Sequence, residues 1–92
     1  MPVIFTAEAL DDLAHIRQHI GRENPHAATR VAVQLVAACD RLEYLPERGR
    51  TGLVSGTREL TVIWPYVIVY RISASSVEIL RVWHGAQDRD GC

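Results

Sequence analysis

The 92-residue sequence predicts one α+β domain with the order β-α-α-β-β-β, in which a helical hairpin packs on one face of a small, mainly antiparallel sheet. The first observation is a set of three short runs rich in β-branched and aromatic residues, at 57–64, 66–73 and 76–84. Such runs are typical of strands, and connections this short predict an antiparallel meander. The second observation is that apolar residues recur every three or four positions over 7–21 and 25–45, which predicts two helices.

The first helix is preceded by a short apolar segment, residues 2–5, which is predicted to be an edge or joining strand. Thr6 is suited to cap the helix, and Glu8 in its first turn interacts favourably with the helix dipole. An apolar stripe then follows helical spacing: Leu10, Leu13, Ile16 and Ile20. Gly21 marks the predicted end of this helix.

The second helix begins at Asn24-Pro25, a capping residue followed by proline in the first turn. Its apolar seam steps by three and four residues through Ala28, Val31, Leu35, Ala38, Leu42 and Leu45. Pro46 ends the pattern. Because the connection between the helices is only a few residues long, they are expected to form an αα-hairpin.

The second helix carries more apolar residues than one packing seam requires. Val33, Val36 and Ala37 lie off the seam. This surplus indicates either a deeply buried helix or a contact surface for another chain, which includes a second copy of this one.

The three meander strands are predicted to be apolar on both faces. In the strand predicted at 76–84, strict alternation places Val77, Ile79, Arg81 and Trp83 on one face. In the strand predicted at 57–64, it places Leu60, Val62 and Trp64 on one face. A sheet that is apolar on both sides is normally covered on both sides. The hairpin can cover one face, so a partner is expected on the other.

Charge and cysteine content narrow the class of protein. The first half is net negative and the second half net positive, with a basic, glycine-rich loop at 47–56, which indicates an acidic partner. No apolar run approaches the roughly 18–20 residues of a membrane span, so no membrane association is expected. Without a signal-peptide pattern, and with only Cys39 and Cys92, a reduced, cytoplasmic protein is expected.

Several segments together resemble the RelE/ParE superfamily of bacterial type II toxins. The resemblance rests on the order and spacing of residues 6–9, 24–28, 56–60, 65–71 and 77–88, and it covers almost the whole chain. It implies a toxin of a plasmid-stabilisation type of system, neutralised by a cognate antitoxin whose C-terminal segment wraps the toxin. It also implies that operator DNA is contacted only through the antitoxin, and that no metal or other cofactor is needed.

The superfamily divides by target. RelE-like members cleave mRNA in the ribosome, whereas ParE-like members bind and poison DNA gyrase. The ribonuclease branch commonly has an arginine just after the aromatic residue that opens the central strand, and here that position is Val67. The resemblance therefore favours a ParE-like gyrase inhibitor that is not an enzyme. The alternatives are a ribosome-dependent endoribonuclease and a degenerate, non-toxic member that binds only its antitoxin.

Candidate site residues follow from both functions. For the ribonuclease, Arg58 and Arg81 are candidate phosphate-binding cations and His84 is a candidate acid or base. For partner binding, the candidates are apolar, aromatic or basic: Val33, Val36, Ala37, Arg50, Arg58, Trp64, Tyr66, Arg71, Arg81 and Trp83. The polar tail at 86–92 is a further candidate.

Overall fold

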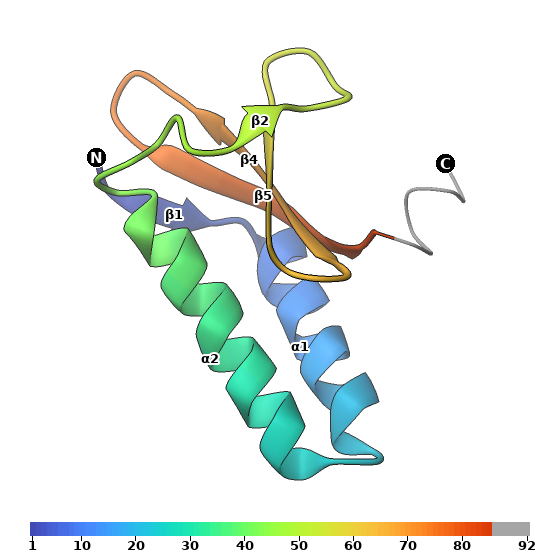
Figure 1. Cartoon of the computed structure of the whole chain (residues 1–92). Helices are drawn as coiled ribbons and strands as arrows, with labels where there is room; N and C mark the ends of the chain where they lie inside the picture. The colour runs from blue at the N-terminus through green and yellow to red at the C-terminus, as the bar shows by residue number, and fades with distance from the viewer. Residues whose placement is uncertain (86–92) are drawn as a thin grey trace.

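The sheet has five strands in the order β1-β5-β4-β3-β2 in the computed structural model, which describes residues 1–85 (Figure 1). The elements are β1 Val3–Phe5, α1 Ala7–Gly21, α2 Pro25–Arg41, β2 Arg50–Thr51, β3 Arg58–Ile63, β4 Tyr66–Ile72 and β5 Val77–His84. β1 pairs with β5 in parallel and every other pairing is antiparallel. This confirms the predicted α+β fold, and it adds the two-residue edge strand β2, which the sequence analysis missed.

Both helices begin at the predicted capping residues. The hydroxyl of Thr6 accepts a hydrogen bond from the Ala9 amide at 3.2 Å, and the side chain of Asn24 accepts one from the Ala27 amide at 3.0 Å. The Thr6 hydroxyl also donates to the carbonyl of Ile79 at 2.9 Å. The cap of α1 therefore also attaches that helix to β5.

The second helix is shorter than predicted, because it ends at Arg41 and not at Leu45. The amides of Glu43 and Tyr44 bond to carbonyls three residues earlier, so the backbone tightens into a turn. Leu45 is consequently exposed, and the helical spacing counted it as a core residue only because it falls in phase with Leu42.

Two β-bulges change the predicted faces of the strands. Along the β4–β5 pairing, Val69 lies opposite Arg81 but Tyr70 lies opposite Ile79, so Leu80 is an extra residue. A second shift lies between Leu60 and Ile63 of β3.

The predicted face assignments are therefore wrong beyond each bulge. In β5, Val77 and Ile79 share a face with Val82, whereas Arg81 and Trp83 point to the other side. In β3, Ile63 packs against the same core cluster as Leu60.

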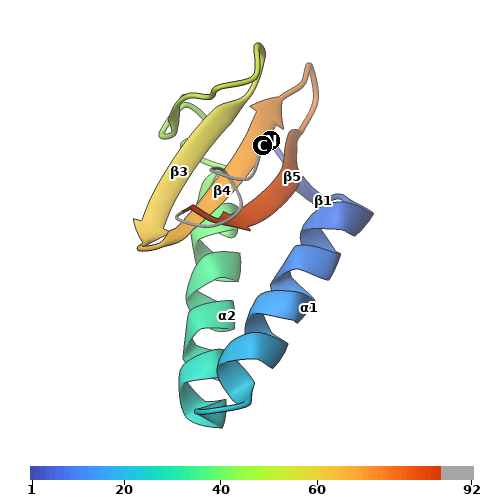
Figure 2. The ribbon, with the colours of Figure 1, turned by 90° about the vertical axis from the view of Figure 1, so that its right-hand side faces the viewer.

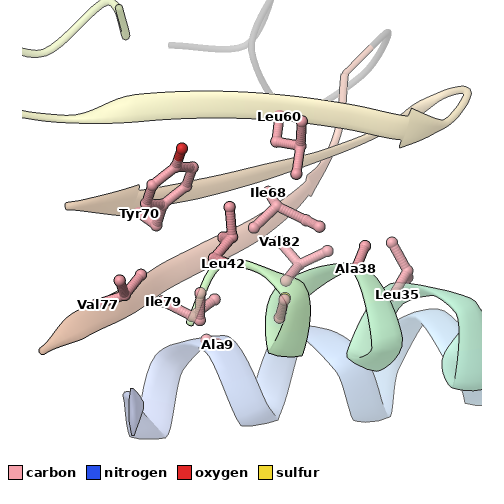
Figure 3. Close-up of a cluster of buried hydrophobic side chains, with 11 residues drawn as sticks. Ala9, Leu35, Ala38, Leu42, Leu60, Ile68, Tyr70, Val77, Ile79 and Val82 are labelled. Atoms are coloured by element: carbon pink, nitrogen blue, oxygen red, sulfur yellow. The ribbon is translucent and has the colours of Figure 1, made fainter. Parts of the chain in front are cut away.

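The core lies between the sheet and the hairpin, with both helices on the same side of the sheet (Figures 2 and 3). Its buried members come from α1, α2, the C-cap residue Leu42 that follows α2, β3, β4 and β5: Ala9, Leu35, Ala38, Cys39, Leu42, Leu60, Ile68, Tyr70, Val77, Ile79 and Val82. The far end of the hairpin extends beyond the sheet in Figures 1 and 2.

The opposite side of the sheet, here called the open face, is covered by neither helix. It consists of Glu59, Val67, Val69, Arg71, Glu78, Arg81 and Trp83. The bulge at Leu80 brings Arg81 to this face, so it is less apolar than the sequence predicted.

Candidate functional site

Arg58 lies at the start of β3 and is bound to the loop before β2. Its Nη1 donates hydrogen bonds to the carbonyl of Gly49 at 2.8 Å and to that of Glu47 at 3.3 Å. Backbone carbonyls thus occupy part of the guanidinium's capacity for hydrogen bonds, and Arg58 holds the basic loop against the sheet.

Tyr70 fixes the same loop from the core side. Its hydroxyl donates to the carbonyl of Pro46 at 2.7 Å and accepts from the Gly49 amide at 2.8 Å. A side chain at Gly49 would place its Cβ 2.6 Å from the phenol oxygen, so only glycine fits there. Burial raises the pKa of Tyr70, and the nearby charge of Arg58 partly opposes that rise.

Arg81 joins the sheet to α1. Its guanidinium donates two hydrogen bonds to the carboxylate of Asp12, at 2.7 and 3.0 Å, and it lies 5.4 Å from the ring centroid of Trp83. The Asp12 carboxylate also accepts from the Val82 amide at 2.9 Å. Asp12 therefore satisfies an amide of β5 beyond the point where β1 ends, in place of a neighbouring strand.

His84 ends β5 and packs edge-on against Tyr66, with ring centroids 5.6 Å apart and an interplanar angle of 88°. His84 is opposite Tyr66 in the strand register, whereas Arg58 is opposite Tyr70. Four residues of β4, roughly 13 Å along the strand, separate those two positions. Arg58 and His84 are therefore far apart along the sheet, and Arg81 lies on its open face. The structure thus does not bring the three candidate catalytic residues together at one point.

The remaining candidate residues of the sheet are paired or exposed. Arg71 forms an ion pair with Glu78. Arg50 lies 3.4 Å from Glu59, whose buried carboxylate also accepts the Leu53 amide at 3.1 Å.

The indole of Trp64 is 73% exposed at the turn between β3 and β4. Tyr66 and Trp83 are half-buried. Trp64 is therefore the most accessible of the aromatic candidates.

The candidates on α2 face away from the core. Val33 is 61% exposed, Val36 is exposed and Ala37 is half-buried, and they line a shallow depression of ≈ 390 Å³ together with Ala32 and Asp40. This rules out the deeply buried reading of the helix and leaves the reading of a contact surface.

Sequence analysis did not predict several exposed apolar side chains outside the helices and strands, among them Tyr44, Leu45, Leu53 and Val54. Leu53 and Val54 lie between β2 and β3, in a loop that looked only basic and glycine-rich. The one sequence signal for exposed apolar residues here was that Leu53 and Val54 are adjacent within a glycine-containing turn.

Neither helix described within residues 1–85 combines the length and apolarity that crossing a membrane requires.

The family model of the ParE toxin of the type II toxin–antitoxin system parDE matches residues 3–89. Toxin RelE2 of Caulobacter vibrioides is 45% identical over 85 residues, which cover 92% of this chain and 96% of that protein. Toxin RelE1 of the same organism is 36% identical over 90 residues, covering 95% of this chain and 96% of that one.

A solved structure described as the chromosomal ParDE TA system from P. aeruginosa superposes with a TM-score of 0.85 at 27% identity. The match covers 91% of this chain and 95% of the other. The helical hairpin and the mixed five-stranded sheet are thus shared with that protein.

Proposed function

Because this chain belongs to the ParE toxin family of type II toxin–antitoxin systems, we propose that it inhibits growth by binding DNA gyrase and that a cognate antitoxin neutralises it. Gyrase inhibition of this kind requires a binding surface and no set of acid and base groups. Both partners lie in the bacterial cytoplasm in this proposal.

The observation that carries the proposal is Val67, the second residue of β4, which is the central strand of the sheet. The ribonuclease branch commonly has an arginine at this position, and the valine here is 3% exposed and opposite Trp83 in the sheet register. Without an arginine at position 67, stabilising a pentacoordinate phosphate would fall to Arg58 and Arg81, which already bind other groups of the chain.

The open face is the proposed binding site of the antitoxin. It is the side of the sheet that neither helix covers, and it carries Arg71 and, further along the sheet, Arg81 beside the indole of Trp83. Arg50 and Trp64 extend this surface along β2 and the β3–β4 turn. Arginine and aromatic residues are the types enriched at protein-binding hot spots.

A ribosome-dependent endoribonuclease is the second candidate, because two of the similar toxins bear the name RelE. RNA cleavage needs a base, a phosphate-binding cation and an acid. His84 and Arg81 would supply some of these, but Arg58 lies near the far end of β4 from His84.

A gyrase supercoiling assay with the purified toxin tests the proposal. Supercoiling is expected to fall as the toxin is titrated and to be restored when the toxin is first mixed with its antitoxin. Unchanged supercoiling at high molar excess would reject gyrase as the target.

Induction in cells separates the candidates. A DNA-damage response is expected for gyrase binding, whereas arrested translation with mRNA cleavage that is lost in His84→Ala or Arg81→Ala would establish the ribonuclease. Normal growth on induction without antitoxin would identify a non-toxic member that only binds its antitoxin.

A further inference from the structure

The exposed side of α2 carries a second, regular seam. Arg30, Val33, Ala37 and Asp40 follow one another at intervals of three, four and three residues, the spacing of a helix-pairing seam. The core-facing seam, which includes Leu35, Ala38 and Leu42, lies on the opposite side of the same helix. The helix therefore has two apolar seams, and within residues 1–85 only the core-facing one is packed.

The apolar centre of this outer seam is accessible and has small neighbours. Val33 is 61% exposed, and Val36 is exposed beside it. The shallow depression of ≈ 390 Å³ beside these valines is also lined by Ala32 and Ala37. Small residues at these places allow another helix to approach the backbone of α2 closely.

The charged ends of the seam have opposite signs. Arg30 lies toward the N-terminal end and Asp40 toward the C-terminal end, and both are exposed. Within residues 1–85, neither side chain has a hydrogen-bonding or ion-pair partner. An occupant that complements this seam should thus offer an acidic group at one end and a basic group at the other.

We propose that a second copy of this chain binds here, so that the two α2 helices pair antiparallel in a two-fold symmetric dimer. The two-fold axis passes the helix pair at the height of Leu35. The two seams then run in opposite directions, and each Arg30 lies opposite Asp40 of the second copy. The same register places each Val33 opposite Ala37 of the second copy.

A parallel pairing is excluded by the same residues, because it would bring Arg30 next to Arg30 and Asp40 next to Asp40. The antiparallel arrangement also opposes the two helix dipoles. It uses one surface patch on both subunits, as a two-fold interface must.

The expected dimer is reversible, because one face of a 17-residue helix buries less than the roughly 800 Å² per partner of a standard interface. This dimer involves α2 alone, so it is independent of the proposed gyrase binding.

Sedimentation equilibrium of the purified free toxin over about 1 µM to 1 mM tests the proposal. The mass is expected to rise from one chain to two. Val33→Glu should weaken the dimer by about tenfold or more, because it places a carboxylate in the apolar centre of the seam. Leu10→Glu, at a 54% exposed leucine of α1, is the matched control and should leave the dimer unchanged. Circular dichroism and urea unfolding verify that each variant is folded.

Charge reversal tests the antiparallel register. Arg30→Glu and Asp40→Arg should each weaken the dimer, and the double variant Arg30→Glu/Asp40→Arg should restore it, because both ion pairs are then reversed together. A toxin that remains monomeric to about 1 mM would overturn the proposal, as would a double variant no tighter than the single ones. A monomeric toxin whose antitoxin binding is lost in Val33→Glu would assign the seam to the antitoxin instead.

Discussion

At the scale of single residues, Tyr70 shows how one hydroxyl can order a loop. It donates to Pro46 and accepts from Gly49, while its ring lies fully buried in the core. Its loop partners lie more than twenty residues away in the chain, and both are backbone atoms. Sequence analysis therefore placed Tyr70 in the predicted strand 66–73 without a role of its own, since backbone partners leave no mark in the sequence.

Tyr70→Phe is expected to lower the free energy of unfolding by about 1–3 kcal/mol, because it leaves the buried Gly49 amide without its acceptor. Urea unfolding at neutral pH measures the change. Tyr44→Phe removes a hydroxyl from a 79% exposed side chain and is the control that should alter little. Equal effects in the two variants would refute the role assigned to the Tyr70 hydroxyl.

Cys39 makes the alkaline stability of the fold testable. Burial, with a smaller contribution from the charge of Asp40, raises the pKa of its thiol from 9.0 to about 12. Below pH 9 the thiol is protonated in both the folded and the unfolded states, so its contribution to stability is fully present. As the pH rises from 9 to 12, ionisation favours the unfolded state by up to about 1.4 kcal/mol per pH unit.

In a Cys92→Ser background, Cys39→Ala is therefore expected to flatten the fall of unfolding free energy between pH 9 and 11, although it lowers stability at pH 7 through the lost packing. Urea unfolding across this range gives both slopes. Parallel slopes for the two proteins would show that the Cys39 thiol does not ionise on unfolding. Tyr66 and Tyr70, whose pKa values burial also raises, contribute equally to both curves.

At the scale of elements, the bulge at Leu80 determines which residues of β5 reach each face. It turns Arg81 toward Asp12 of α1 and leaves Val82 in the core. The number, type and order of the main elements were predictable because helical and strand periodicities are local. The bulges were not, since alternation assumes a regular register and the extra residue is defined only by the neighbouring strand.

Asp12→Ala is expected to destabilise the fold by about 1–2 kcal/mol, because it removes the hydrogen bonds to Arg81 and to the Val82 amide from a partly exposed site. Asp11→Ala is the matched control. The Asp11 side chain is 70% exposed, and its ion pair within residues 1–85 is with the nearby His15. A double-mutant cycle between Asp12 and Arg81 should give a clear coupling energy. Additive effects would show that the pair does not stabilise the attachment of α1 to β5.

At the scale of the whole molecule, the hairpin occupies one side of the sheet, so neither helix covers the other side and the outer seam of α2 is exposed. The sequence correctly indicated surplus apolar surface on α2. It overestimated the apolar character of the open face, because the bulge at Leu80 places Arg81 there. Its candidate catalytic residues fall at separate places, which no spacing along the chain could reveal.

Trp64→Ala is expected to weaken antitoxin binding by about tenfold to a hundredfold with little effect on folding, because exposed tryptophans often dominate protein interfaces. Isothermal titration of the toxin with its antitoxin measures the change. Tyr44→Ala, at an equally exposed aromatic away from the sheet's meander turn, is the control. Unaltered affinity in Trp64→Ala would remove this turn from the proposed interface.

The parallel pairing of β1 with β5 has a consequence for synthesis on the ribosome. β5 is the last strand of the described chain, yet it lies between β1 and β4, and Val3 pairs with Val77. Contacts so distant in sequence form late in folding. A nascent or prematurely terminated chain that stops before Val77 therefore leaves β1 without its neighbour and the core without Val77, Ile79 and Val82. The strand order thus delays completion of the core and of the sheet surface until translation has passed β5.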